Sequence, residues 1–308
     1  MRFFCALLLL WALAACSRSK PPAPELRPES PIGGVEPSAG SSPAEEIPGG
    51  ELPDLAETIA RLAQGIADTA EFADRLRVAF TAAALPEAMM QHITDSMSAS
   101  PAFILDLLGC LEEEPYLRML VDKQHSLPQG YEPADLVELK PAPHAGRDGS
   151  YKVGRAGLML RREAAESLDE MAEAAQTQGV TLVASSAYRS YNYQVEVYNR
   201  NVREMGQESA DRESARPGYS QHQTGLVVDF GSIDDSFAET AAGRWIAANA
   251  SRFGWSISFP QGYEAVTGYR WESWHYRYVG RELAGFIDNY FDGIQQYALR
   301  FLYEWETP

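Results

Sequence analysis

Between residues 120 and 287 the apolar residues switch repeatedly between helical spacing and short strand-like runs, and this switching limits the possible folds most strongly. Runs typical of buried strands cover residues 181–185, 226–230, 255–259 and 274–279. Helical spacing covers residues 165–175, 195–205, 242–253 and 283–305. Because these elements do not alternate as regular strand–helix–strand units, we expect an α+β domain with a mostly antiparallel sheet flanked by helices.

A region of purely helical spacing, residues 52–119, precedes this domain. Apolar residues recur there at three- and four-residue steps, which is the pattern of an amphipathic helix. Pro86 and Pro101 interrupt the pattern and indicate about three helices. The region carries no recognisable catalytic pattern, so it could be a spacer, a dimerisation element or a support for the next domain. Residues 288–308 are expected to form a C-terminal helix.

The first residues have the features of a secretory signal. Arg2 is followed by an uncharged apolar run over residues 3–13, which is too short for a bilayer-spanning helix of about 20 residues. The run ends in Leu13-Ala14-Ala15-Cys16, which resembles the bacterial lipobox. That resemblance implies a signal peptide over residues 1–15 and a lipidated Cys16. The alternative is an ordinary signal cleaved near Ala15, with Cys16 incidental.

Residues 16–51 are expected to form a tether. Residues 17–51 contain eight prolines, five glycines and six serines. A segment of this composition buries too little apolar surface to offset its ordering entropy, so we expect an extended, mobile segment. Together with the lipobox, it places the folded part in the bacterial cell envelope, attached to a membrane only through a lipid and facing the extracytoplasmic or periplasmic side.

Charge and cysteine content exclude several classes of protein. The chain has 26 Lys+Arg against 43 Asp+Glu, a formal net charge of -17, which argues against a nucleic-acid partner. The three cysteines are too few for a disulfide framework or a cysteine-rich structural zinc site. We expect Cys110 to be a small buried apolar residue. Any metal must therefore be held by His, Asp or Glu.

Two short stretches, residues 220–229 and 272–275, together contain two histidines and two carboxylates. A catalytic zinc site needs three protein ligands and one open position, which two His and one carboxylate satisfy. Asp229 ends an apolar strand, where a buried charge is costly unless it is paired or bound to metal. Glu272 is longer and lies three residues before His275, so it is suited to act as a base beside the metal.

One geometric condition follows from this assignment. Residues 272 and 275 of a straight strand point to opposite faces of the sheet. If Glu272 and His275 serve one site, the chain must bend or bulge around Ser273.

The sequence resembles the VanY-type zinc D-alanyl-D-alanine carboxypeptidases, which are relatives of the VanX dipeptidases and of the hedgehog fold. The likeness covers residues 120–287 and rests on three motifs of that family, present in order. They are Ser-x-Tyr-Arg-Ser-x-x-x-Gln, Ser-x-His-x-x-Gly-x-x-x-Asp and Glu-x-Trp-His, carried here by Ser186, Tyr188, Arg189, Ser190 and Gln194, by Ser220, His222, Gly225 and Asp229, and by Glu272, Trp274 and His275.

This resemblance implies roles for particular residues. Zn²⁺ would be held by His222, Asp229 and His275, and Glu272 would be the general base and then the acid. Arg189 would stabilise the oxyanion or bind the substrate carboxylate. The pocket for the terminal D-alanine would be lined by Ser186, Tyr188, Gln194 and Ser220.

The resemblance also implies a function, with alternatives that the sequence leaves open. The expected activity is a zinc-dependent D,D-carboxypeptidase that removes the C-terminal D-alanine from peptidoglycan stem peptides. Relatives of this type include L,D-carboxypeptidases, and endopeptidase action on cross-links is a further possibility. The remaining alternative is a non-catalytic zinc-containing module that binds peptidoglycan, but a degenerate copy would be expected to lose Glu272 or a ligand.

Overall fold

The computed structural model describes residues 69–140 and 149–307. The predicted signal peptide, Cys16, the tether and residues 52–68 of the helical segment lie outside the described residues, so those predictions stay predictions. Within the described ranges, no helix combines the length and apolar character needed to cross a membrane.

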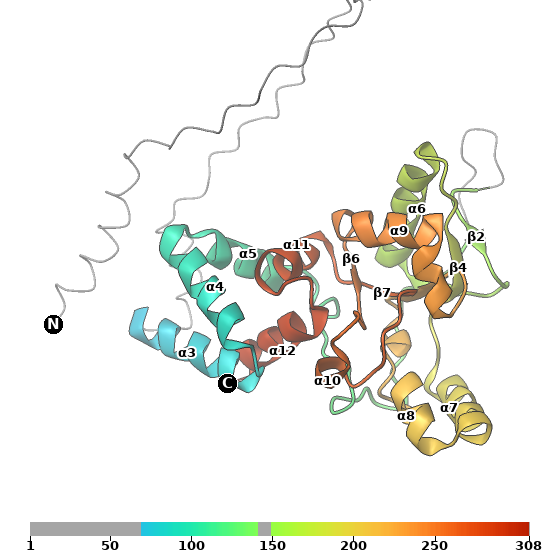
Figure 1. The fold of residues 1–308 in the computed structure, drawn as a ribbon, viewed down its shortest axis with the longest axis horizontal. Coiled ribbons are helices and arrows are strands. Elements are labelled where there is room, and N and C mark those ends of the chain that lie inside the picture. Colours follow the sequence, from blue (N-terminus) through green and yellow to red (C-terminus); the bar gives the residue numbers. More distant parts are fainter. Residues whose placement is uncertain (1–68, 141–148, 308) are drawn as a thin grey trace, which may run out of the picture. The chain divides into compact units, whose positions relative to one another are not determined.

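A five-stranded sheet forms the centre of the region that follows residue 149 (Figure 1). Its strands lie in the order β2 (Lys152–Val153), β4 (Val183–Ser186), β5 (Val227–Phe230), β7 (His275–Tyr278) and β6 (Trp255–Ile257). Strands β2 and β4 are parallel, and every other neighbouring pair is antiparallel. A separate antiparallel ribbon pairs β1 (Leu136–Glu138) with β3 (Met159–Arg161). The predicted α+β fold with a mostly antiparallel sheet is confirmed.

Helices α6 (Arg162–Thr177) and α9 (Ala241–Asn249) share one apolar core with the strands. The predicted face of α6 is buried along its whole length, at Ala165, Leu168, Met171, Ala172 and Ala175. This face packs with strand residues such as Val228 and Phe230. Helix α9 is preceded by η3 (Asp235–Glu239) and continues into a 3₁₀ turn, η4 (Ala250–Phe253), before Gly254 starts the approach to β6.

Two helices separate the sheet segments that carry the predicted site. Helix α7 (Tyr191–Met205) begins at Ser190, whose side-chain oxygen accepts a hydrogen bond from the Tyr193 backbone N–H at 3.2 Å. It ends at Gly206, whose positive φ of 82° closes the helix, and α8 (Gln207–Glu213) follows. The chain then enters the short 3₁₀ helix η2 (Gln221–Thr224), which leads into β5.

Five helices form a second apolar core. They are α3 (Thr69–Ala82), α4 (Glu87–Ala99), α5 (Ala102–Glu112), α11 (Arg281–Tyr290) and α12 (Gln295–Glu306). Pro86 and Pro101 immediately precede α4 and α5, as the sequence predicts. Figure 1 shows the first three helices beside the last two, although more than 160 residues of sequence separate them. We call these five helices the helical region and the sheet with its helices the sheet region.

The predicted single helix from residue 283 to residue 305 is instead two helices. The chain leaves α11 after Tyr290 and resumes helical structure at Gln295. Asp292 and Gly293 both have positive φ angles, 52° and 73°, which a right-handed helix does not allow. The spacing of apolar residues continues across this break, so periodicity alone does not reveal it. Within the helical region, Cys110 is buried, as predicted, and burial raises the pKa of its thiol.

Candidate metal centre

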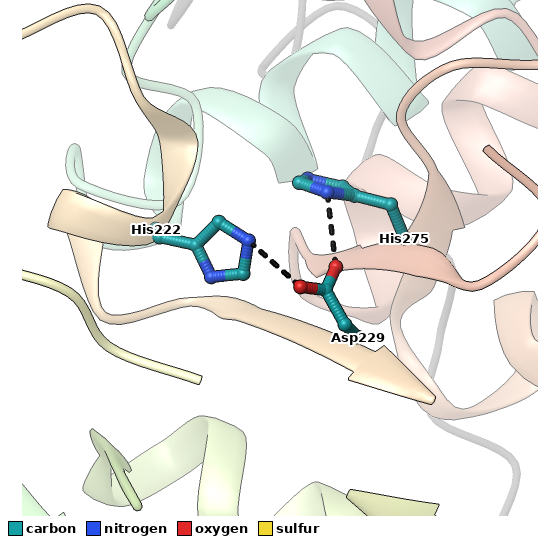
Figure 2. A group of neighbouring side chains, drawn as sticks. All are labelled: His222, Asp229 and His275. Atoms are coloured by element: carbon teal, nitrogen blue, oxygen red, sulfur yellow. Dashed lines mark ion pairs between the residues drawn. The ribbon is translucent and has the colours of Figure 1, made fainter. Parts of the chain in front are cut away.

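The sheet places two of the predicted ligands side by side. Asp229 on β5 lies directly opposite His275 on β7 in the antiparallel register. Side chains of opposite residues project on the same face of a sheet, with Cβ atoms about 5 Å apart. His222 joins them from η2, the turn that leads into β5. The three residues are 3–5% exposed, and their side chains converge on one point (Figure 2).

Ligand-type atoms of the three residues lie close together. The Nε2 atom of His222 is 3.2 Å from Oδ2 of Asp229, and Nδ1 of His275 is 3.2 Å from Oδ1 of the same carboxylate. One atom from each residue can be chosen so that all lie within 4.8 Å of one another. Figure 2 shows the carboxylate between the two imidazoles.

This arrangement fits a metal ion of the size of zinc. Tetrahedral ligands at about 2.0–2.1 Å from an ion are roughly 3.3–3.4 Å from each other, close to the two His–Asp distances. Asp229 is buried and its two carboxylate oxygens face the imidazoles of His222 and His275, so its negative charge is costly unless a proton or a cation lies beside it. Two imidazoles and one carboxylate are the donor set of many catalytic zinc sites.

The ring of His222 is held in one orientation by the backbone. Its Nδ1 atom lies 2.7 Å from the carbonyl oxygen of Ala187. If Nδ1 carries the proton and donates it to this oxygen, the lone pair of Nε2 faces Asp229. Burial, reinforced by the positive charge of Arg189, lowers the pKa of His222 to about 4, so the ring is neutral near pH 7. A neutral imidazole is the form that binds metal.

The two carboxylates favour a positive charge between them. Burial alone would raise the pKa of Asp229, but the charge and hydrogen bonding of His222 and His275 hold it well below its usual range. Burial would lower the pKa of His275, yet Asp229 and Glu272 raise it to about 9. The site therefore attracts a proton or a metal cation.

Glu272 is placed beside the predicted ligands by a turn. The backbone N–H of His275 donates to the Glu272 carbonyl oxygen at 3.3 Å, so the chain bends through Ser273 as the sequence assignment requires. Oε2 of Glu272 lies 3.3 Å from Nδ1 of His275. Glu272 is 7% exposed, and burial raises the pKa of its carboxyl group. A carboxyl in this environment binds a proton more readily than a solvated one.

Arg189 extends its guanidinium to the same point from the turn after β4. Its Nη2 atom lies 3.8 Å from Oδ2 of Asp229. Nη1 donates a hydrogen bond to Oε1 of Gln194 at 2.8 Å, and Nη2 donates to Oγ of Ser186 at 3.2 Å. Two neighbours thus fix the plane of the guanidinium beside the metal ligands.

The four predicted substrate-pocket residues take different places. A cavity of about 330 Å³ adjoins Glu272 and the three ligands, and Ser220 is part of its wall. Ser186 and Gln194 do not line it but lie behind Arg189, and the Gln194 side chain is fully buried. Tyr188 does not line it either. The structure therefore groups Ser186 and Gln194 with the support of Arg189.

Sequence reasoning missed several residues of the cavity wall. One face of α7 contributes Val197, Arg200, Asn201 and Met205, and aromatic residues contribute Tyr219, Phe259 and Tyr269. The α7 residues of the cavity wall recur at three- and four-residue steps, so the sequence does place them on one face of a helix. The apolar stripe that the sequence predicts for this helix, Val195, Tyr198, Val202 and Met205, shares only Met205 with the cavity wall, and polar residues on a helix are usually solvated.

The chain is similar in sequence to known proteins. The VanY family model, described as D-alanyl-D-alanine carboxypeptidase, matches residues 157–281. The putative carboxypeptidase YodJ of Bacillus subtilis (strain 168) is 36% identical over 191 residues, which cover 60% of this chain and 68% of that protein. The chain belongs to the VanY family. The family match contains all the metal-centre residues, whereas α3, α4, α5 and α12 lie outside it.

Two solved structures are similar to part of the chain. The LdcB LD-carboxypeptidase is 37% identical, with a TM-score of 0.49 over 57% of this chain and 85% of that one. A variant of the D,D-pentapeptidase VanY from a VanB-type resistance cassette, solved in complex with Zn(II), is 29% identical, with a TM-score of 0.46 over 58% of this chain and 96% of that one.

Proposed function

We propose that the chain is a zinc-dependent carboxypeptidase that removes the C-terminal D-alanine from peptidoglycan stem peptides. The observation that carries the proposal is the buried group of His222, Asp229 and His275 with the Glu272 carboxyl beside it. Membership of the VanY family supports the choice of substrate class.

His222, Asp229 and His275 would hold the zinc ion. When bound, zinc polarises the scissile carbonyl and lowers the pKa of water to about 7. The neutral ring of His222 and the ionised carboxylate of Asp229 are already in the protonation states of ligands. Binding a dication at this point would displace the proton that the carboxylates otherwise hold on His275.

Glu272 moves the proton in the proposed reaction. Its carboxylate accepts a proton from the attacking water and then donates it to the departing amine of D-alanine. Burial raises the pKa of this carboxyl, which makes the first transfer easier and keeps the acid available for the second.

Arg189 is the candidate for binding negative charge on the substrate. Its guanidinium lies 3.8 Å from Asp229 and is oriented by Gln194 and Ser186. A planar, pre-oriented guanidinium can bind a terminal carboxylate through two parallel hydrogen bonds or stabilise the oxyanion of the tetrahedral intermediate. A non-catalytic module would need neither this orientation nor a base beside the ligands.

The test is mass spectrometry of muropeptides digested by the purified, zinc-supplemented chain. The proposal predicts that pentapeptides lose one alanine and that tetrapeptides and cross-links persist. Conversion of tetrapeptides to tripeptides would show the L,D activity instead, and loss of cross-linked dimers would show an endopeptidase. Unchanged muropeptides would contradict the proposal and favour the binding module.

We also propose that Cys16 carries a lipid that attaches the protein to a membrane of the cell envelope. Its support is the lipobox-like Leu13-Ala14-Ala15-Cys16 and the tether that follows. In a bacterial host, labelled fatty acid should enter the wild-type chain and not the Cys16→Ser variant. Equal labelling of both would contradict the anchor.

A further inference from the structure

A buried polar cluster joins the helical region to the metal centre. Gln295, the first residue of α12, is 1% exposed, and its neighbours Gln221 and Ser258 are 4% and 2% exposed. Nε2 of Gln221 donates to Oε1 of Gln295 at 3.4 Å, and Oγ of Ser258 donates to Oε1 of Gln221 at 2.7 Å. Nε2 of Gln295 donates to the carbonyl oxygen of Ser256 on β6 at 3.2 Å.

The cluster contacts both segments that carry the candidate histidine ligands. Gln221 directly precedes His222 in η2. The backbone N–H of Ser258 donates to the carbonyl oxygen of His275 at 3.2 Å. One set of hydrogen bonds therefore runs from the His222 turn, through Gln221 and Ser258, to the start of β7. Gln295 links this set to β6, because its carboxamide bonds both Gln221 and the carbonyl oxygen of Ser256.

We propose that Gln295 is a positioning residue that keeps the His222 and His275 segments at the separation zinc requires. This inference rests on the proposed function, because it assumes that the three ligands hold a metal. Hydrogen-bond partners outside the ligand set orient ligands and tune metal affinity. Buried polar networks in which each member is paired specify one arrangement of the groups they join.

Through Gln295, the helical region would influence the metal centre. Gln295 lies outside residues 157–281, the part of the chain that matches the VanY family model. Its helix, α12, packs on α3 through the apolar core of the helical region. Helix α12 thus brings one carboxamide into contact with Gln221, the residue before His222, from outside residues 157–281.

The competing explanation is that Gln295 only helps to dock α12. Gln296 provides a matched control, because it follows Gln295 in the same turn of α12 and is 3% exposed. Its Nε2 atom donates to Oδ2 of Asp122 at 2.6 Å, and the same carboxylate pairs with His125. The Asp122 pairing fastens α12 to the segment between α5 and β1, and within the described ranges neither Gln296 nor Asp122 forms a hydrogen bond or ion pair with a candidate ligand.

The test compares Gln295→Met with Gln296→Met in the full chain. Methionine keeps the length of glutamine and removes its hydrogen bonds. We expect Gln295→Met to weaken zinc affinity about tenfold or more, as measured by competition with a chromophoric chelator. Gln296→Met should change zinc affinity by less than about twofold. Both variants should lower the unfolding temperature of the metal-free protein, and by similar amounts.

Ser258→Ala provides a second route to the same link, because it removes the Ser258–Gln221 hydrogen bond from the β6 side. Like Gln295→Met, this variant should weaken zinc binding. It keeps the proposal testable if Gln295→Met folds poorly. Wild-type affinity in Gln295→Met or Ser258→Ala, or equal weakening by Gln295→Met and Gln296→Met, would overturn the positioning role. Failure of the wild-type chain to bind zinc, with no difference from His222→Ala, would instead overturn the proposed function on which it rests.

Discussion

The two cores of this chain differ in what they bury. The core of the helical region is apolar and aromatic, with Phe103, Phe286 and Phe301 in mutual ring contact. The sheet region has an apolar core of its own, but beside it lie the buried side chains of His222, Asp229, Glu272, His275 and Arg277. Burying charged groups is costly even when they are paired.

The difference indicates that the buried groups of the sheet region serve chemistry and those of the helical region serve stability. Apart from Arg277, these charged groups of the sheet region are closely spaced, pairwise oriented and next to a cavity, which is the arrangement expected of chemistry rather than of stability. The aromatic contacts of the helical region stabilise the fold and contain no charged group that could take part in a reaction. Changes in the first set should therefore alter activity, and changes in the second should alter unfolding.

Glu272→Gln should have the largest effect, a loss of activity without a loss of stability. Removing the proton acceptor should lower turnover of a stem pentapeptide about 10⁴-fold, about 5.5 kcal/mol in the activation barrier. The free energy of unfolding should stay the same or rise, because a buried carboxyl whose pKa is raised is replaced by a neutral amide. Zinc stoichiometry and denaturant unfolding check the variant. Retained turnover would remove Glu272 from the mechanism.

Phe301→Ala should have the converse effect in the helical region. The ring is fully buried among Phe80, Phe103 and Phe286, so its loss should lower the free energy of unfolding by about 4 kcal/mol. Val78→Ala, at a side chain that is 58% exposed, should change it by less than about 0.5 kcal/mol. Denaturant unfolding compares the two variants. Similar small losses in both would contradict a stabilising core here.

Arg189→Lys should reduce activity less than Glu272→Gln. Lysine keeps the charge but cannot make the paired, planar contacts with Gln194 and Ser186. We expect kcat/KM to fall about 10²-fold. Arg203→Lys, on the exposed side of α7, is the control and should be neutral. If Arg189→Lys behaves like that control, charge alone suffices at this position.

Glu113→Gln should have the smallest effect, on the pH dependence of stability. Burial and the nearby charges of Glu282 and Glu163 raise the pKa of Glu113 to about 7 in the folded chain. The folded state then binds more protons than the unfolded state, so this stabilising contribution is full below about pH 4.5 and is lost as the pH rises through 7.

The variant should therefore flatten the fall in unfolding free energy between pH 5 and pH 8. Glu114→Gln, at the exposed neighbouring position, should leave that fall as in the wild type. Identical pH dependence in the wild type and Glu113→Gln would show that the buried carboxyl has no such influence.

The sequence predicts the sheet region better than the helical region. Short β-branched and aromatic runs identify β4, β5, β6 and β7, because local spacing reflects which faces are buried. The contact of α12 with α3 joins residues more than 200 positions apart, and local spacing holds no information about it. The sequence also does not predict the break between α11 and α12 at Asp292 and Gly293, because the apolar spacing continues through it.

The residues in and around the metal centre also differ in how well the sequence predicts them. His222, Asp229, Glu272 and His275 follow from motif and chemistry, and the structure brings all four together. The positions of Gln194 behind Arg189 and of Gln295 beside Gln221 do not follow, because they depend on how helices pack on the sheet. A glutamine in a helix carries no sequence signal that separates a solvated residue from a buried partner.

The most direct test of the central claim is metal reconstitution of the full chain. Protein dialysed against a chelator should release no D-alanine from a stem pentapeptide. One equivalent of zinc should restore release in the wild type and fail to do so in His222→Ala. D-alanine release by the chelated protein, or restoration of His222→Ala by one equivalent of zinc, would contradict the account.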